Sequence, residues 1–156
     1  MFFYFERSAA QAQNVVRDLG RLSLGIRTGT RELLERAVDE VVRPSIAGQF
    51  EASGEPKWEE LEPATEERRV RAGFESGPPL VASGAGRDLA TSRAPWSITK
   101  TEATYTAPDG PIRYHQEGTE GHVPARPYLR IGDREARQLD RLGLAWIDGV
   151  AARFGF

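Results

Sequence analysis

The two histidines, His115 and His122, mark the one place where this sequence could assemble a metal site. They are seven residues apart, and Glu117 and Glu120 lie between them. Imidazole nitrogens and carboxylate oxygens are the ligands of catalytic zinc, so His115, Glu117 and His122 together would make a small metal-dependent hydrolase. Their spacing, however, matches neither a helical histidine pair nor an established zinc motif. The His-x-Glu fragment also lacks the cysteines that accompany it in deaminases.

The other motifs that could support catalysis are incomplete. Gly84 and Gly86 resemble half of a phosphate-binding loop, but no Gly-Lys-Ser/Thr follows them. Ser83 lacks the upstream strand and glycine of a nucleophile elbow. Adjacent carboxylates such as Glu59 and Glu60 lie in a charged stretch that is typical of a solvated surface. The sequence therefore predicts a protein that is not an enzyme, with no catalytic residue, no metal ligand and no cofactor.

Composition and charge favour a folded protein of the size of one domain, residues 1–156. Apolar residues make up 39% of the chain and charged residues 28%, values near the globular average. The formal net charge of −2 disfavours a protein whose main role is to grip nucleic acid. A local basic patch at Arg68, Arg69 and Arg71 keeps a nucleic-acid-binding module open as an alternative. Because the chain has no cysteine, its fold cannot contain a disulfide, which fits assembly in a reducing cytoplasm.

The N-terminal half reads as an aromatic segment followed by helices. Residues 2–5 are Phe-Phe-Tyr-Phe and predict a short strand, with Phe3 and Phe5 either in an edge of the core or in a subunit contact. Because an acidic residue follows and no basic flank precedes, we expect neither a signal peptide nor a membrane span. A first helix is expected over residues 8–19, stopped by Gly20. A second, amphipathic helix begins at Thr30, and Pro44 should kink or end it before the same pattern resumes.

The second half predicts a long irregular excursion, then strands and a final helix. Residues 53–86 are rich in Gly, Pro and charge, with one short helix at 63–71, and form a candidate contact arm. Strands are expected at residues 96–105, 112–117 and 128–131. A last helix should begin at Asp133, with an inner face of Ala136, Leu139, Leu142, Trp146 and Val150. This order predicts an α+β fold in which helices cover a small, mainly antiparallel sheet.

The segment Pro124-Ala-Arg-Pro-Tyr128 has a more specific character. Its two prolines hold the backbone extended, and Arg126 presents a planar, charged fork between them. Two interpretations remain open: Arg126 satisfies a buried carbonyl or carboxylate of its own subunit, or it acts across a subunit contact.

An ordered series of motifs links this segment to the middle of the chain. The series consists of Phe50, Gly54-Glu-Pro-Lys-Trp58, Leu61, Thr65 with Arg68 and Arg69, Leu80 with Ser83-Gly84, Tyr114-His-Gln-Glu-Gly118 and Pro124-Ala-Arg-Pro-Tyr-Leu129. In order and in most gaps it resembles the Mu-like virion morphogenesis and tail-completion proteins of tailed phages. The resemblance covers about residues 45–131, whereas the first fifty residues match only in being strand and helix.

The resemblance implies a tail-terminator-like subunit that forms a ring, usually a hexamer, at the head-proximal end of the tail. Its partners would be further copies of itself, neighbouring neck or connector proteins and the tail tube, with no membrane and with nucleic acid at most passing through the ring lumen. It would be located in the virion, and in the host cytoplasm during assembly. The candidate interface residues are Phe3, Phe5, Trp58, Arg68, Arg69, His115, Gln116, Arg126 and Tyr128. Trp58 and Tyr128 are also candidates for the core.

Overall fold

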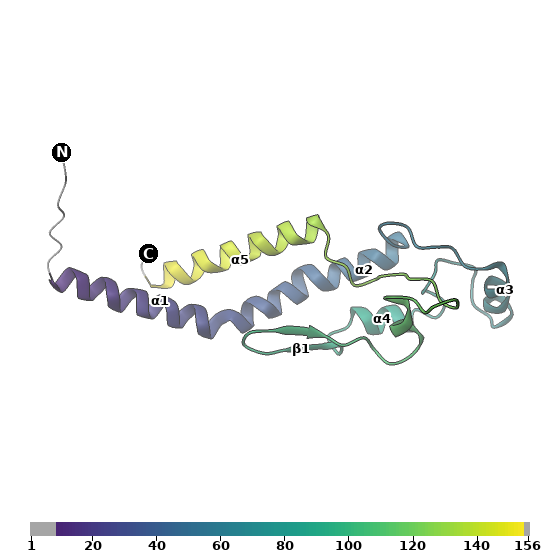
Figure 1. Cartoon of the computed structure of the whole chain (residues 1–156), viewed down its shortest axis with the longest axis horizontal. Coiled ribbons are helices and arrows are strands. Elements are labelled where there is room, and N and C mark those ends of the chain that lie inside the picture. The colour runs from purple at the N-terminus through teal and green to yellow at the C-terminus, as the bar shows by residue number, and fades with distance from the viewer. Residues whose placement is uncertain (1–8, 155–156) are drawn as a thin grey trace.

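The computed structural model describes residues 9–154 and shows an elongated α+β arrangement built along one long helix (Figure 1). Helix α1 (Ala9–Arg36), a π-helical segment η1 (Ala37–Val42) and helix α2 (Arg43–Ala52) follow one another without a break. Helix α5 (Asp133–Arg153) runs back along α1 on one side of this rod, and a β-hairpin lies on the other side. The remaining elements gather around α2, at the end of the molecule away from the start of α1.

The prediction that Gly20 ends the first helix is wrong, because α1 continues through it to Arg36. A helical glycine costs only about 1 kcal/mol relative to alanine, which packing elsewhere in a long helix can offset. The helix also continues through Pro44, as the resumed apolar pattern indicated. Pro44 lies in the first turn of α2, directly after the wider turns of η1, where the Arg43 amide donates to the Val38 carbonyl. These wider turns leave room for the proline ring.

Two helical glycines set the distance between α1 and α5. A Cβ at Gly29 would lie 2.8 Å from Cζ2 of Trp146, and one at Gly25 would overlap the Phe154 ring. The predicted inner face of α5 is confirmed at its centre, where Leu142, Trp146 and Val150 are buried. Of its other two members, Leu139 is half-buried and Ala136 is exposed. The helices therefore pack closely because glycine leaves space for the α5 side chains.

The Gly29→Ala variant is expected to be less stable than the wild type by roughly 1–3 kcal/mol, because the added methyl overpacks Trp146. Gly143→Ala is the matched control: a Cβ there meets nothing within 4 Å, so alanine should stabilise the helix by about 0.5–1 kcal/mol. Urea unfolding measures both values. A stabilising Gly29→Ala would show that the two helices do not need this close approach.

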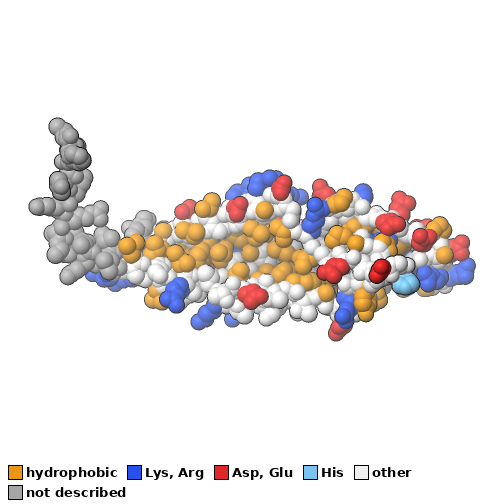
Figure 2. Space-filling view, in the orientation of Figure 1, with side chains coloured by type: hydrophobic (Ala, Val, Ile, Leu, Met, Phe, Trp, Pro, Cys, Tyr) orange, Lys and Arg blue, Asp and Glu red, His pale blue; other side chains and the backbone are white. Residues whose placement is uncertain are grey.

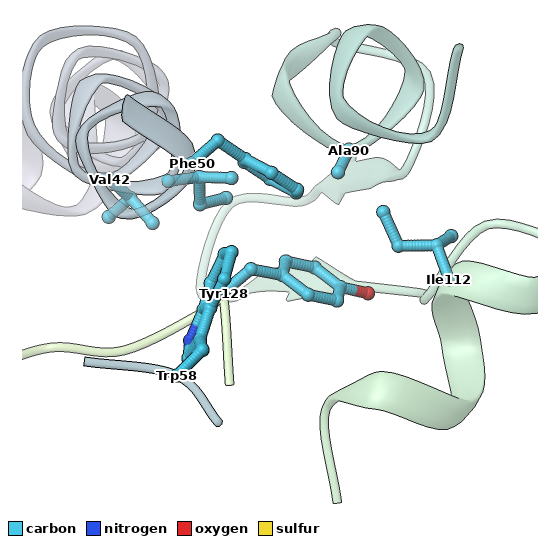
Figure 3. Close-up of a cluster of buried hydrophobic side chains, with 7 residues drawn as sticks. Val42, Phe50, Trp58, Ala90, Ile112 and Tyr128 are labelled. Atoms are coloured by element: carbon cyan, nitrogen blue, oxygen red, sulfur yellow. The ribbon is translucent and has the colours of Figure 1, made fainter. Parts of the chain in front are cut away.

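The main core surrounds α2. It comprises Val42, Ile46, Phe50, Trp58, Ala90, Ile112 and Tyr128, most of which Figure 3 shows. The ring centroid of Phe50 lies 5.6 Å from that of Trp58, edge to face, and 5.7 Å from that of Tyr128, nearly parallel. Tyr128 is fully buried, and its ring also lies 6.4 Å from Tyr105 of the hairpin. Aromatic packing of this kind contributes beyond the area it buries.

The sheet is a single antiparallel pair within the described residues, smaller than the sequence predicted. Strand β1 (Trp96–Ile98) pairs with β2 (Ala103–Tyr105), so the strand expected over residues 96–105 is a hairpin. Thr99 forms its turn: its amide donates to Glu102 O, and its hydroxyl accepts from the Glu102 amide. This local cap lets four residues reverse the chain where alternation alone suggested continuity.

The other two predicted strands are wrong. Residues 111–115 form a 3₁₀ helix, η2 (Pro111–His115), whose first position is proline. Gly110 precedes it with φ of 112°, a conformation that favours glycine and turns the chain into the helix. Residues 128–131 lie in no strand, and the chain bends at Leu129.

The mid-chain excursion contains the predicted helix α3 (Pro63–Arg71), whose side chains are exposed or half-buried. It ends in a helix that the sequence did not predict, α4 (Ala85–Thr91). Gly84 has φ of 76° and caps α4, and Ala90 is fully buried against the core. Within residues 9–154, no helix combines the length and apolar character needed to cross a membrane.

Candidate functional site

The Gln116 side chain organises the segment from Tyr114 to Leu129. Its Nε2 donates to Leu129 O at 2.8 Å, and its Oε1 accepts from the amides of Tyr128 at 3.2 Å and Leu129 at 3.1 Å. One amide side chain thus gives the backbone of Tyr128 and Leu129 the hydrogen-bond partners that a neighbouring strand would otherwise supply. These two residues therefore need no place in a sheet.

Arg126 is buried and bonds within its own subunit. Its Nε and Nη2 donate to Glu59 O at 3.0 and 2.9 Å, and Nη2 also donates to Glu60 O at 3.1 Å. Its backbone amide donates to His115 O at 2.6 Å. Burial lowers the pKa of its guanidinium, while the Glu59 carboxylate opposes that shift. Of the two interpretations that the sequence left open, the structure shows bonding within the subunit. The guanidinium holds the backbone of Glu59 and Glu60, near the start of the excursion.

Trp58 also links the start of the excursion to the Pro124-to-Leu129 segment. Its Nε1 donates to Pro127 O at 3.2 Å, and its own amide donates to Ser53 O at 2.8 Å. Gly54 has φ of 87°, and a Cβ there would lie within 2.7 Å of the Trp58 ring. The glycine and tryptophan of the Gly54-to-Trp58 motif therefore depend on each other in a tight reversal after α2.

Gly118 closes the loop that follows Gln116. It has φ of 77°, and a Cβ there would lie 2.7 Å from Val123 O and 2.8 Å from the Ala125 amide nitrogen. Beside it, the Thr119 amide donates to Val123 O at 2.8 Å. The loop is thus tied down by backbone contacts that only glycine permits at this position.

The structure brings together motifs that are far apart in the chain. Trp58, Gln116, Arg126 and Tyr128 form one connected cluster, which we call the clamp, in which the motif residues hold one another. The side chains of Trp58, Arg126 and Tyr128 are buried inside the subunit rather than offered to a neighbour. Phe3 and Phe5 lie outside the described residues.

A groove of about 900 Å³ opens beside the clamp, between α3, α4, η2 and the loop over residues 119–124. The predicted site residues Arg68, Arg69 and His115 line it, together with His122. Arg69 donates to Gly77 O at 3.1 Å and Arg68 to Thr65 Oγ1 at 3.0 Å, so both arginines bond within the arm.

The residues considered for nucleic-acid and metal binding are only partly brought together. Arg71 pairs with Glu67 at 3.0 Å on the exposed side of α3 and does not line the groove. His115 and His122 share the groove, but Glu117 does not line it. In the part of the chain that the structure describes, no three His, Asp or Glu side chains are grouped so that they could hold a metal ion.

His115 makes stability sensitive to pH. Burial lowers its pKa below the ordinary value, and the nearby Arg126 charge lowers it further. The unfolded chain therefore binds the proton more readily, so the contribution of neutral His115 is complete above about pH 6.5 and is lost as pH falls below it. His115→Gln should flatten this part of the stability profile, measured by urea unfolding at several pH values. His122→Gln changes the exposed histidine of the same groove and is the control; an equal flattening there would contradict the assignment.

No protein-family model matches this sequence, and no curated protein or solved structure shows significant similarity to it.

Proposed function

We propose that this protein is a structural subunit of a tailed-phage virion, a tail-completion subunit of the tail-terminator type that forms a ring at the head-proximal end of the tail. The observation that carries the proposal is the clamp. The motif series that resembles the phage family runs from Phe50 to Leu129, and four of its residues, Trp58, Gln116, Arg126 and Tyr128, meet in this one cluster although they come from distant parts of the series. Other motif residues lie on α3 and before α4, outside the clamp.

The placement of the clamp residues agrees with a structural role. They hold the backbone of the Pro124-to-Leu129 segment and the start of the excursion in fixed positions. A rigid scaffold of this kind positions surface loops for contact with other subunits. The groove and α3 then form a shaped surface at one end of the molecule.

The shape of the molecule supports a ring as well. A closed ring is built from head-to-tail contacts between two unlike surfaces of the same subunit. The long helix separates two such surfaces: the paired helices α1 and α5 at one end, and the arm with its groove at the other (Figure 1). We propose further copies of the chain, neck or connector proteins and the tail tube as partners.

Native mass spectrometry of the purified chain and proteomics of purified virions test this function. We expect a closed ring, most simply a hexamer, and a fixed small number of copies per virion. Deleting the gene should give heads and tails that do not join, and supplying the protein in trans should restore joining. A chain that stays monomeric at all concentrations and is missing from virions would overturn the proposal.

A further inference from the structure

The pair of helices α1 and α5 carries an apolar face that is not covered within the described structure. On α1, Leu19, Leu22 and Ile26 recur at steps of three and four residues and so form one stripe. On α5, Leu144 and Ile147 form a second stripe, and they are 64% and 46% exposed. We call these residues the front face.

The two stripes lie on the same side of the helix pair. Ile26 follows Gly25, and Ile147 follows Trp146, where Gly25 and Trp146 are positions at which the helices touch. One residue further along a helix turns the side chain by about 100°. Because α1 and α5 run antiparallel, these equal turns bring both side chains to the same side of the pair. Figure 2 shows a continuous band of hydrophobic side chains over this helix pair.

A contiguous apolar surface of this kind marks an interaction site, whereas scattered exposed leucines do not. Leu19 on α1 is 53% exposed, so both helices contribute large, accessible side chains. The turn of the hairpin meets the end of the α1 stripe, where Thr30 Oγ1 donates to Lys100 O and Ile26 lines a hollow with Lys100 and Thr101. Leu19, Leu144 and Ile147 remain exposed beside it.

Residues 2–5 lie too close to the start of α1 to cover the α5 part of the front face of their own chain. Trp146 packs at the level of Gly29, which lies about 30 Å along α1 from Ala9. Eight extended residues reach at most about 28 Å, and the chain would first have to reverse direction. Phe5 is only four residues from Ala9. Residues 2–5 of the same chain therefore do not reach Leu144 and Ile147.

We propose that the front face binds the aromatic residues 2–5 of a second copy of this chain. This inference rests on the proposed ring and names one of its contacts. Residues 2–5 are Phe-Phe-Tyr-Phe, without a charge, and aromatic side chains are the types that anchor interfaces. They precede α1, which begins beyond the end of α5 (Figure 1), so the segment starts at an end of the subunit where a neighbour can lie. A segment-to-face contact joins unlike surfaces and can be repeated around a ring.

Because the chain has no cysteine, introduced cysteines report this contact without background. Phe3→Cys and Ile147→Cys are made as single variants, mixed and mildly oxidised. We expect a covalent dimer in the mixture and little dimer from either variant alone. Ala152→Cys, an exposed site on the same helix about 140° around from Ile147, is the matched control and should cross-link at least tenfold less.

Ile147→Ser gives a second measurement, because the Ile147 side chain is exposed and lies outside the buried face of α5. We expect the ring to dissociate to monomers while the midpoint of thermal unfolding of the subunit is unchanged. Phe3→Ser should have the same effect.

Three results would overturn the inference. Efficient dimers of Ile147→Cys alone would mean that the front face pairs with itself, and cross-linking to Phe74→Cys would assign it to the arm of a second copy. A ring that forms without the Phe3-to-Ile147 cross-link would refute this contact and leave the proposed function standing. Conversely, the cross-link in a chain that never closes into a ring or enters virions would refute the function and keep the contact.

Discussion

Arg126→Met should lower the free energy of unfolding by about 2–5 kcal/mol. The substitution removes the guanidinium that donates to Glu59 O and Glu60 O, and methionine can donate to neither. Hydrogen bonds to a charged group contribute roughly 1.5–3 kcal/mol each, and both carbonyls lose theirs. Methionine carries no charge, so the variant avoids the desolvation cost of the buried guanidinium, and this gain offsets part of the loss. Urea unfolding followed by tryptophan fluorescence measures it, since Trp58 packs in the same clamp.

Arg126→Lys is the informative control. Lysine keeps the charge but replaces the planar fork with a single ammonium group, so it cannot reproduce the same hydrogen bonds to two adjacent carbonyls. We expect a stability between those of the wild type and Arg126→Met. If Lys restored full stability, the charge rather than the fork geometry would hold the excursion in place. If Met were as stable as the wild type, the clamp would not depend on Arg126.

Gly118→Ala should destabilise the protein by about 2–4 kcal/mol. Part of the cost, roughly 1–2 kcal/mol, is the left-handed backbone that glycine adopts there. The rest comes from the new Cβ, which would press against the backbone of Val123 and Ala125, atoms that cannot rotate away. Thermal or urea unfolding measures the total.

Gly121→Ala separates the two causes. Gly121 lies in the same loop with φ of 73°, but a Cβ there meets nothing within 4 Å. It should therefore show only the backbone cost. Equal losses for the two variants would mean that the loop near Gly118 can move to admit the methyl, and that the close approach to Val123 is not needed.

The helical parts of the fold could be predicted from the sequence, because a long amphipathic pattern has few other solutions. Leu142, Trp146 and Val150 recur at helical spacing and are the buried residues of α5. Helix α3 was predicted within its observed bounds from its flanking proline and glycine. The helix end at Gly20 was predicted wrongly, since a single glycine is a weak stop when packing further along the helix favours continuation.

The strands were predicted less well because side chains replace the backbone partners that define a sheet. The backbone of Tyr128 and Leu129 bonds the Gln116 side chain, and no local pattern reveals this contact, which for Tyr128 spans twelve residues. The Thr99 hydroxyl forms the hairpin turn, and Pro111 begins the 3₁₀ helix. Both change the backbone in places where the short alternation of apolar and polar residues predicted a strand.

The candidate site was located by its motifs, but the roles of its residues were not. The sequence allowed Arg126 and Trp58 either a place inside the subunit or a place in an interface. Only their bonds to carbonyls more than sixty residues away show that both side chains face inward. The exposed Leu144 and Ile147 were not predicted as a surface feature, because single apolar residues outside the buried face of a helix are common and indicate no function by themselves. Gly25 and Gly29, four residues apart, were the signal that α1 meets another helix closely.

The π-helical segment η1 makes the long helix tolerant of a change in length at one point. A π turn holds about one residue more than an α turn, so removing one residue from Ala37–Val42 would return the segment to α geometry with little rotation of α1 against α2. A deletion elsewhere in the rod would rotate one end by about 100° against the other. At this one segment the chain can therefore lose a residue while the front face and the clamp keep their orientation relative to each other.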